Sequence, residues 1–161
     1  MRILVLSDTH VPRMVSDIPK AIYDEIGRSD LILHAGDFTD IGFYKKLLKM
    51  KRMIGVCGNM DAKEVSSLLK PKEVVRAGKF TIGLIHGWGP PEGLIERISA
   101  EFEPEMPDCI VFGHSHKPFN EKIGKVLFFN PGSATDKVFA PYNSYGIIEA
   151  GDKLTAEIIK L

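Results

Sequence analysis

Residues 3–10 read ILVLSDTH, so an apolar run passes without a break into serine, aspartate, threonine and histidine. The chain repeats this arrangement at 31–37, LILHAGD, and at 53–61, MIGVCGNMD. Apolar runs of this length, bounded by glycine and polar residues, are typical of strands. The three segments therefore predict three strands, each with polar side chains at its carboxyl end.

Helical periodicity separates these three runs. Isoleucine recurs at every fourth position over 18–26, with Ser16 or Asp17 as the predicted N-cap and Gly27 as the stop. Asp40 can cap a second helix, whose apolar positions follow at the same kind of spacing. The resulting β-α-β-α-β order predicts a mostly parallel sheet with right-handed crossovers.

The second half of the chain has shorter strands and hairpins. The elements that its pattern predicts are a hairpin of 74–75 with 80–85, a helix opened by Pro90 and Pro91, strands at 109–112 and 126–129, and a hairpin of 145–149 with 154–159. We expect an α/β fold of two packed mixed β-sheets flanked by helices, formed as one domain by residues 1–161.

The composition narrows the classes of function. Lysine and arginine number 21, as do aspartate and glutamate, so the formal charge is zero and a broad basic surface for long nucleic acid is not expected. The two cysteines, Cys57 and Cys109, are too few for a disulfide framework. The apolar run at the start is too short for a signal peptide or a membrane span. These features predict a soluble cytoplasmic protein that does not bind membranes.

Five of the predicted strands are followed by aspartate, asparagine or histidine, which are residue types that commonly bind metals. These residues are Asp8 and His10, Asp37, Asn59, His86, and His114 with His116. Because ligands of open α/β sheets bind at the carboxyl ends of strands, we expect all of them at one edge. Imidazole, carboxylate and amide donors without thiolate favour Mn, Fe, Co, Ni or Zn over Mg or Ca. The set is too large for one tetrahedral zinc, so we predict two ions with Asp37 as the bridge.

Two pairs of these residues are two positions apart, Asp8 with His10 and His114 with His116. Residues i and i+2 of an extended chain point to the same side. We therefore expect each pair to converge on one centre without a special turn.

The motifs, in this order, resemble those of the calcineurin-like metallophosphoesterase superfamily. They are Asp-x-His at 8–10, Gly-Asp at 36–37, Gly-Asn-x-Asp at 58–61, His-Gly at 86–87 and Gly-His-x-His at 113–116, followed by Asn-Pro-Gly-Ser at 130–133. The short chain resembles the small YfcE-type phosphodiesterase branch. The resemblance implies a β-sandwich flanked by helices. It also implies one metal on Asp8, His10, Asp37 and His116, and a second on Asp37, Asn59, His86 and His114.

The same resemblance implies hydrolysis of a phosphodiester by a hydroxide that bridges two divalent ions, with manganese first and nickel, iron, cobalt or zinc as alternatives. Asn59 and His86 are expected to take part in catalysis as well as in metal binding. Met60 stands where larger members of the superfamily have a histidine that protonates the leaving group. Asp61 is the candidate replacement, and its alternative role is to hold the loop. Without the usual acid, we expect a preference for aryl or nucleotide leaving groups.

Other functions are compatible with the same residues. One is a non-catalytic metal-binding scaffold like the retromer subunit of the superfamily, and another is a phosphomonoesterase or nucleotide pyrophosphohydrolase. The expected partner is a small phosphodiester or nucleotide, and a homodimer is expected only because dimers are common.

Arg13 is either a phosphate contact or a solvated charge, and Trp88 either covers the site or anchors its loop. His34, inside an apolar run, is expected to be buried and not a ligand.

Overall fold

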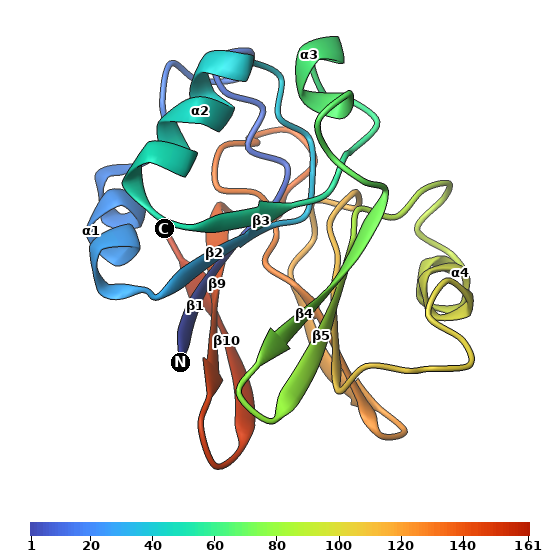
Figure 1. Cartoon of the computed structure of the whole chain (residues 1–161). Coiled ribbons are helices and arrows are strands. Elements are labelled where there is room, and N and C mark those ends of the chain that lie inside the picture. The colour runs from blue at the N-terminus through green and yellow to red at the C-terminus, as the bar shows by residue number, and fades with distance from the viewer.

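The computed structural model describes residues 1–161, and its strands form two sheets that face each other (Figure 1). The strands of the first sheet are β1 (Arg2–Leu6), β2 (Leu31–His34), β3 (Met53–Gly55), β9 (Ser144–Ala150) and β10 (Leu154–Lys160), in the order β10-β9-β1-β2-β3. The strands of the second are β4 (Lys72–Ala77), β5 (Phe80–Ile85), β6 (Cys109–Val111), β7 (Phe119–Ile123) and β8 (Val126–Asn130), in the order β4-β5-β6-β8-β7.

Both sheets are mixed. In the first, β1, β2 and β3 are parallel, and β9 and β10 continue the sheet with antiparallel pairings. In the second, β5, β6 and β8 are parallel, and β4 and β7 are antiparallel edge strands. Neighbouring parallel strands end at the same edge of their sheet, so the polar residues that follow them are brought together.

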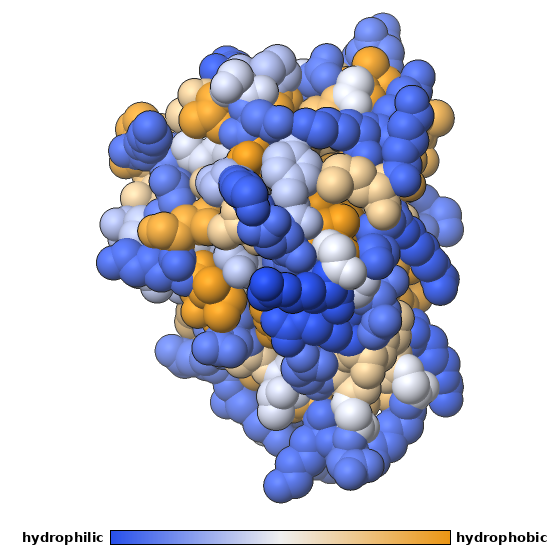
Figure 2. All heavy atoms as spheres, turned by 90° about the vertical axis from the view of Figure 1, so that its left-hand side faces the viewer, coloured by the Kyte–Doolittle hydropathy of each residue, from blue (hydrophilic) through white to orange (hydrophobic).

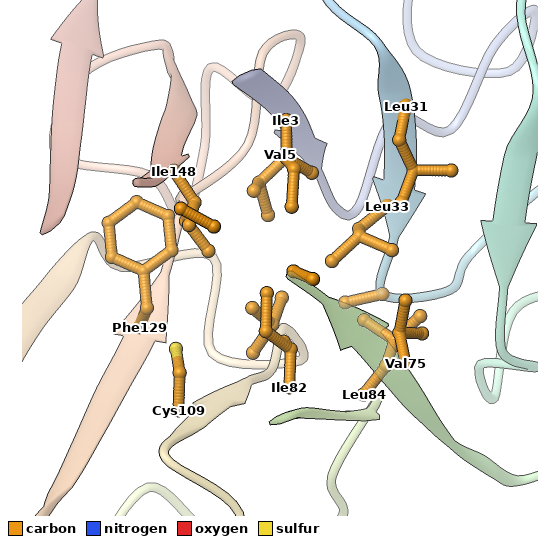
Figure 3. Close-up of a cluster of buried hydrophobic side chains, with 14 of the residues drawn as sticks. Ile3, Val5, Leu31, Leu33, Val75, Ile82, Leu84, Cys109, Phe129 and Ile148 are labelled. Atoms are coloured by element: carbon orange, nitrogen blue, oxygen red, sulfur yellow. The ribbon is translucent and has the colours of Figure 1, made fainter. Parts of the chain in front are cut away.

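The core between the sheets is built from alternate residues of the strands. On β1, Ile3 and Val5 point between the sheets, whereas Leu4 and Leu6 point to the helices outside. Figure 3 shows side chains from the two sheets meeting in this inner layer. Because both faces of β1 are covered, its sequence is apolar throughout and does not alternate.

Helices lie on the outer faces. They are α1 (Lys20–Arg28), α2 (Ile41–Met50), α3 (Lys63–Ser66) and α4 (Leu94–Ala100). Ile22 of α1 and Leu47 of α2 are buried with the outer side chains of the first sheet, and Ile98 of α4 with those of the second. The surface over α1 and α2 is mostly hydrophilic (Figure 2). None of the helices has the length and apolar character needed to cross a membrane. The predicted fold class of two mixed sheets flanked by helices is confirmed.

The first helix differs from its prediction at both ends. It begins after Pro19 and not at Ser16 or Asp17. The Asp17 carboxylate instead accepts a hydrogen bond from Lys46 Nζ at 2.7 Å, which ties α2 to the segment before α1. Gly27 lies inside the last turn of α1 and does not end it.

Three other elements depart from the prediction. Gly93 precedes α4 with a φ of 71°, so Pro90 and Pro91 lie in the loop before the helix and do not open it. The sequence pattern does not predict β7, because most of its residues are exposed at the edge of the sheet. It does not predict α3 either, because a single turn is too short to show a period.

Candidate metal centre

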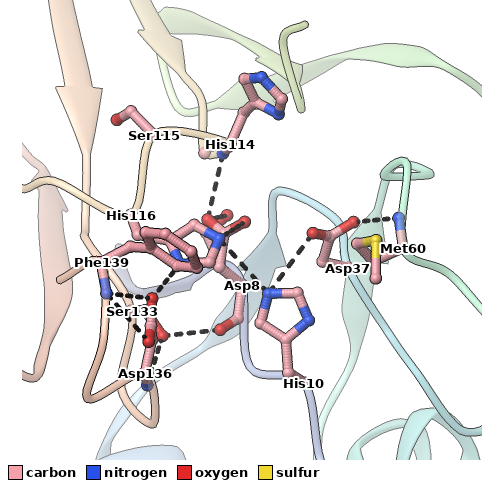
Figure 4. Close-up of polar contacts among 12 residues, drawn as sticks. Asp8, His10, Asp37, Met60, His114, Ser115, His116, Ser133, Asp136 and Phe139 are labelled. Carbon is pink, nitrogen blue, oxygen red and sulfur yellow. Dashed lines mark hydrogen bonds and ion pairs between the residues drawn. The ribbon is translucent and has the colours of Figure 1, made fainter. Parts of the chain in front are cut away.

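The residues predicted as ligands come from the loops that follow β1, β2, β3, β5 and β6. The donor atoms of Asp8, His10, Asp37 and His116 lie within 4.8 Å of one another. Figure 4 shows these side chains directed toward a common point, with the backbone of His114 beside them. The parallel strands have therefore assembled residues that are far apart in the sequence.

The first cluster consists of Asp8, His10, Asp37 and His116. His116 Nε2 lies 3.3 Å from Asp8 Oδ1, and His10 Nε2 lies 3.5 Å from Asp37 Oδ2. The two imidazole nitrogens are 3.4 Å apart. Asp8 and Asp37 are 0% and 2% exposed, so neither carboxylate is solvated by bulk water. Shielded carboxylates and imidazoles arranged in this way are typical ligands of a divalent transition metal.

The second cluster consists of Asp37, Asn59, His86 and His114, and it adjoins the first. Asn59 Oδ1 lies 3.0 Å from His86 Nε2 and 3.1 Å from His114 Nδ1. Asp37 Oδ1 lies 3.5 Å from His86 Nε2, whereas Asp37 Oδ2 faces His10 of the first cluster. Asp37 is therefore shared, with one carboxylate oxygen directed to each cluster.

Hydrogen bonds on the far side of three imidazole rings determine which nitrogen carries the proton. His86 Nδ1–H and His114 Nε2–H donate to backbone carbonyl oxygens at 2.7 Å and 2.9 Å. His116 Nδ1–H donates to the carboxylate of Asp136. In each neutral ring, the nitrogen that faces the clusters then has a free lone pair, as a metal-bound histidine requires.

The donor atoms of both clusters fit cations. Asp8 Oδ1 is buried and has no hydrogen-bond partner, which costs free energy unless a positive charge is close. In the second cluster, Asn59 Oδ1 faces the lone pairs of His86 and His114. Three hydrogen-bond acceptors therefore lie side by side with no donor between them. One divalent ion at each cluster would satisfy all of these atoms.

In the metal-free protein, a proton on His116 supplies positive charge to the first cluster. Burial would raise the pKa of Asp8, but His116 and then His86 outweigh burial and lower that pKa to about 2. Burial would lower the pKa of His116, but Asp8 and Asp136 outweigh it and raise that pKa to about 9. In the metal-free protein, Asp8 and His116 therefore form an ion pair, with His116 Nε2 at 3.3 Å from Asp8 Oδ1.

We expect the metal-free protein to lose stability as the pH rises from 6.5 to about 9. The native pKa of His116 lies above its usual value, so the contribution of this residue is complete below pH 6.5 and is lost as it deprotonates near pH 9. The urea midpoint in EDTA should fall over this range. His116→Gln should flatten the profile, and an equally steep fall in that variant would contradict the assignment.

The loops that carry these residues are strained. The non-glycine residues with positive φ are Asp8 at 51°, His10 at 43°, Asp37 at 68°, His114 at 67° and His116 at 57°. Left-handed backbone is rare outside glycine and gathers at functional sites. The prediction that each i, i+2 pair converges from extended chain is therefore wrong. The left-handed turns direct His114 to the second cluster and His116 to the first.

Two glycines allow the loops to approach one another closely. A Cβ at Gly58 would lie 2.2 Å from Asp37 Oδ1. A Cβ at Gly113 would lie 1.9 Å from Ser7 Oγ and 2.8 Å from Asp8 Oδ2. A side chain at either position would displace a carboxylate of the first cluster.

Gly113→Ala is expected to weaken divalent-metal binding by at least about tenfold, because the new methyl group must move Ser7 and Asp8. Calorimetric titration of the metal-free protein with Mn²⁺ measures this change. Gly27→Ala is the matched control, since nothing lies within 4 Å of a Cβ at that position. If Gly113→Ala bound Mn²⁺ as tightly as the control, Asp8 would not be a ligand.

Asp136 is a buried site residue that the sequence analysis does not predict. Its carboxylate accepts hydrogen bonds from His116 Nδ1–H and, at 2.7 Å, from the backbone N–H of Val138. Nearby, Ser133 Oγ donates to the backbone carbonyl of Asp8 at 2.7 Å, which ties the loop after β8 to the loop after β1. A carboxylate in a loop without periodicity gives no pattern signal, and only its place just after Asn-Pro-Gly-Ser could have indicated it.

Asp61 holds two loops together. Its two oxygens accept hydrogen bonds from the backbone N–H groups of Phe38 at 2.6 Å and Gly58 at 3.0 Å. The adjacent Met60 donates its backbone N–H to Asp37 Oδ1 at 2.7 Å. This geometry favours the loop-holding role of Asp61 over the role of a proton donor.

The structure confirms the predicted burial of His34 and places Trp88, whose role the sequence left open. His34 is fully buried; its Nδ1 accepts a backbone N–H at 3.2 Å and its Nε2 lies 3.1 Å from Thr9 Oγ1. Burial lowers the pKa of His34 to about 3, so this ring is neutral. Trp88 lines a separate cavity of about 200 Å³ and does not line the one over the clusters.

A cavity of about 670 Å³ opens over both clusters. Its cationic lining residues are Arg13 and Lys117, and its apolar ones include Met14, Met60, Val138 and Phe139. A cavity of this size accommodates a small organic ligand. Arg13 is therefore placed where it can contact a phosphate.

Comparisons with known proteins agree with the fold and show the family. Residues 1–153 match the profile of the calcineurin-like phosphoesterase superfamily domain. A probable metallophosphoesterase of Methanocaldococcus jannaschii is 34% identical over 162 residues, which cover 100% of this chain and 82% of that protein. Phosphodiesterase YfcE of Escherichia coli is 31% identical over 105 residues, which cover 61% of this chain and 53% of that protein.

The solved structure of Vps29 from Entamoeba histolytica complexed with Zn²⁺ has a TM-score of 0.75 and 28% identity, over 99% of both chains. The two packed sheets, together with the aspartates and histidines at the ends of their strands, are typical of a metallophosphoesterase. This chain belongs to the calcineurin-like phosphoesterase superfamily, as its motifs predicted.

Proposed function

We propose that this protein is a metal-dependent phosphodiesterase that hydrolyses small phosphodiesters or nucleotide esters at a dinuclear centre. The observation that carries the proposal is the pair of clusters that share Asp37. Two adjacent divalent ions suit an in-line displacement at phosphorus. The similarity to a protein named a phosphodiesterase supports the choice of a diester substrate.

In this proposal, each cluster holds one divalent ion, with manganese preferred. When bound, the ions supply an activated water at neutral pH and Lewis acidity toward the phosphate oxygens. The chain fixes the ligands: backbone carbonyls orient His86 and His114, and Asp136 orients His116. Asn59 lines the cavity and can also contact the substrate, whereas the buried His86 would hold the second ion.

The charge of the site favours an anionic substrate. If two divalent ions and one hydroxide were bound, the carboxylates of Asp8, Asp37 and Asp136 with that hydroxide would balance the charge of the ions. Arg13 and Lys117 line the cavity and pair with no carboxylate, so the opening keeps a positive charge. A phosphodiester, which carries one negative charge, is therefore attracted to this opening.

Hydrolysis forms a bond from phosphorus to the oxygen of a water that has released one proton to solvent, and it breaks the bond to the leaving group, whose oxygen retains the electron pair. Met60 lines the cavity and has no proton to donate to that oxygen. Asp61 is engaged by two backbone N–H groups. The leaving group therefore departs as an anion, which favours aryl and other stable oxyanions.

The experiment that tests the proposal is hydrolysis of bis(para-nitrophenyl) phosphate and para-nitrophenyl phosphate after chelation and readdition of single metals. We expect no turnover in EDTA, restored turnover with Mn²⁺, and a higher kcat/KM for the diester. Ni²⁺, Fe²⁺, Co²⁺ and Zn²⁺ are the comparison metals. Faster turnover of the monoester would replace the proposal by a phosphomonoesterase, and no turnover with any metal would overturn it.

A metal-binding scaffold is the second candidate function. Vps29 matches this chain over its whole length and was solved in complex with Zn²⁺. Metal binding alone therefore does not distinguish the two functions. Tight Zn²⁺ binding without turnover of either ester would favour the scaffold.

A further inference from the structure

An apolar wall, which we define as Met14, Met60, Val138 and Phe139, borders the cavity over the two clusters. Val138 and Phe139 are 71% and 68% exposed, and Met14 and Met60 are 42% and 37% exposed. Figure 4 shows Phe139 beside His116 and Met60 beside Asp37, on either side of the clusters. Large apolar side chains that gather at the mouth of a charged cavity indicate a binding surface.

Hydrogen bonds to Asp136 and Asn143 hold the turn that exposes Val138 and Phe139. The carboxylate of Asp136 accepts the backbone N–H of Val138 at 2.7 Å and that of Phe139 at 3.2 Å. Asn143 Nδ2 donates to the backbone carbonyl of Asp136 at 2.6 Å, which closes the loop. The buried Asp136 also binds His116, so the turn has a fixed position relative to the first cluster.

The orientation of Phe139 suits a planar group. Its ring centroid lies 6.0 Å from that of His116, with an angle of 84° between the planes. The edge-to-face contact with His116 leaves much of the Phe139 ring in solvent, since the residue is 68% exposed. Aromatic rings and nucleobases pack well on such a face, whatever their hydrogen-bonding groups.

The cavity offers both charge and apolar surface. Arg13 and Lys117 bring positive charge to a lining that also includes His10, Asp37 and His116 of the first cluster. The wall brings apolar area beside it, and the whole cavity of about 670 Å³ has room for a nucleotide or an aryl ester. The matching ligand has an anionic phosphate at one end and a flat apolar group at the other.

We infer that the apolar wall binds a planar aromatic substituent of the substrate, so that the preferred substrates are aryl or nucleoside phosphodiesters. The inference rests on the proposed function for the position of the phosphate. Phe139 is the residue that determines this specificity, and Val138 on the same turn widens the apolar surface beside it.

Binding of phosphonates to the Mn²⁺-loaded protein tests this inference without turnover, since their carbon–phosphorus bond is not hydrolysed. Calorimetry should show phenylphosphonate binding about tenfold more tightly than methylphosphonate. Phe139→Ala should reduce this preference to about twofold, and Phe139→Leu, which stays apolar but is not planar, should lose most of it. Val74→Ala is the control, because Val74 is 61% exposed on β4, away from the cavity lining.

Equal affinities of the wild-type protein for the two phosphonates would overturn the inference. Retention of the full preference in Phe139→Ala would do so too, since the ring would then bind elsewhere. If the preference behaves as expected but no ester is hydrolysed with any metal, the proposed function fails and the aromatic site stands.

Discussion

Asp37→Asn is expected to lower phosphodiester hydrolysis by at least about a thousandfold with little effect on folding. The Asp37 carboxylate faces both clusters, with Oδ2 at 3.5 Å from His10 Nε2 and Oδ1 at 3.5 Å from His86 Nε2. Asparagine keeps Oδ1 as the acceptor for the backbone N–H of Met60, which lies 2.7 Å away. It removes the charge and the second oxygen through which two ions would be joined.

The measurements for Asp37→Asn are kcat/KM for bis(para-nitrophenyl) phosphate and the number of Mn²⁺ ions bound. Asp24→Asn, an exposed position paired only with Lys20, is the matched control. His114→Ala should lower turnover in the same direction, since His114 lies at 3.1 Å from Asn59 Oδ1 in the second cluster. Turnover near the wild-type rate in Asp37→Asn would show that the clusters do not carry the reaction.

Hydrolysis is expected to depend steeply on the leaving group, falling by about 10²–10⁴ between para-nitrophenol and an alkyl alcohol as leaving groups. The reason is that Met60 faces the cavity where a proton donor would be useful, and Asp61 is bound by backbone N–H groups. A series of methyl aryl phosphates with graded phenol pKa values measures the slope. A flat series would mean that some other group protonates the leaving oxygen.

Met60→His provides the complementary test of the same prediction. Met60 is 37% exposed at the cavity, so an imidazole fits there without repacking the core. We expect it to raise the rates of the poorest leaving groups by at least about tenfold and to flatten the series. Met14→His is the control, since Met14 lines the same cavity with similar exposure.

The fold could be predicted where the sequence carries a strong period or an unbroken apolar run. Ile3 to Leu6 are apolar without alternation because the other sheet covers one face and helices cover the other. The prediction fails where contacts decide the structure. Asp17 pairs with α2 and so does not cap α1, and the exposed side chains of β7 have no periodic signal.

The convergence of the site could also be predicted, because neighbouring parallel strands end together. The left-handed backbone at Asp8 and His116 could not, because it depends on contacts between loops far apart in sequence. Asp136 was missed for the same reason, since its partners are His116 and its own loop. The ligand roles themselves stay predictions, which metal titration of the single variants would decide.

Asp136 contacts both a predicted metal ligand and the turn at the mouth of the cavity, so it links metal binding to the shape of the cavity. One carboxylate orients His116 and also fastens the turn that carries Phe139. If an ion is bound at the first cluster, a ligand that steadies this turn would also strengthen the binding of that ion, and the ion would strengthen the binding of the ligand by the same factor. Substitutions in that turn would thus change the affinity for the ion and the affinity for the ligand together.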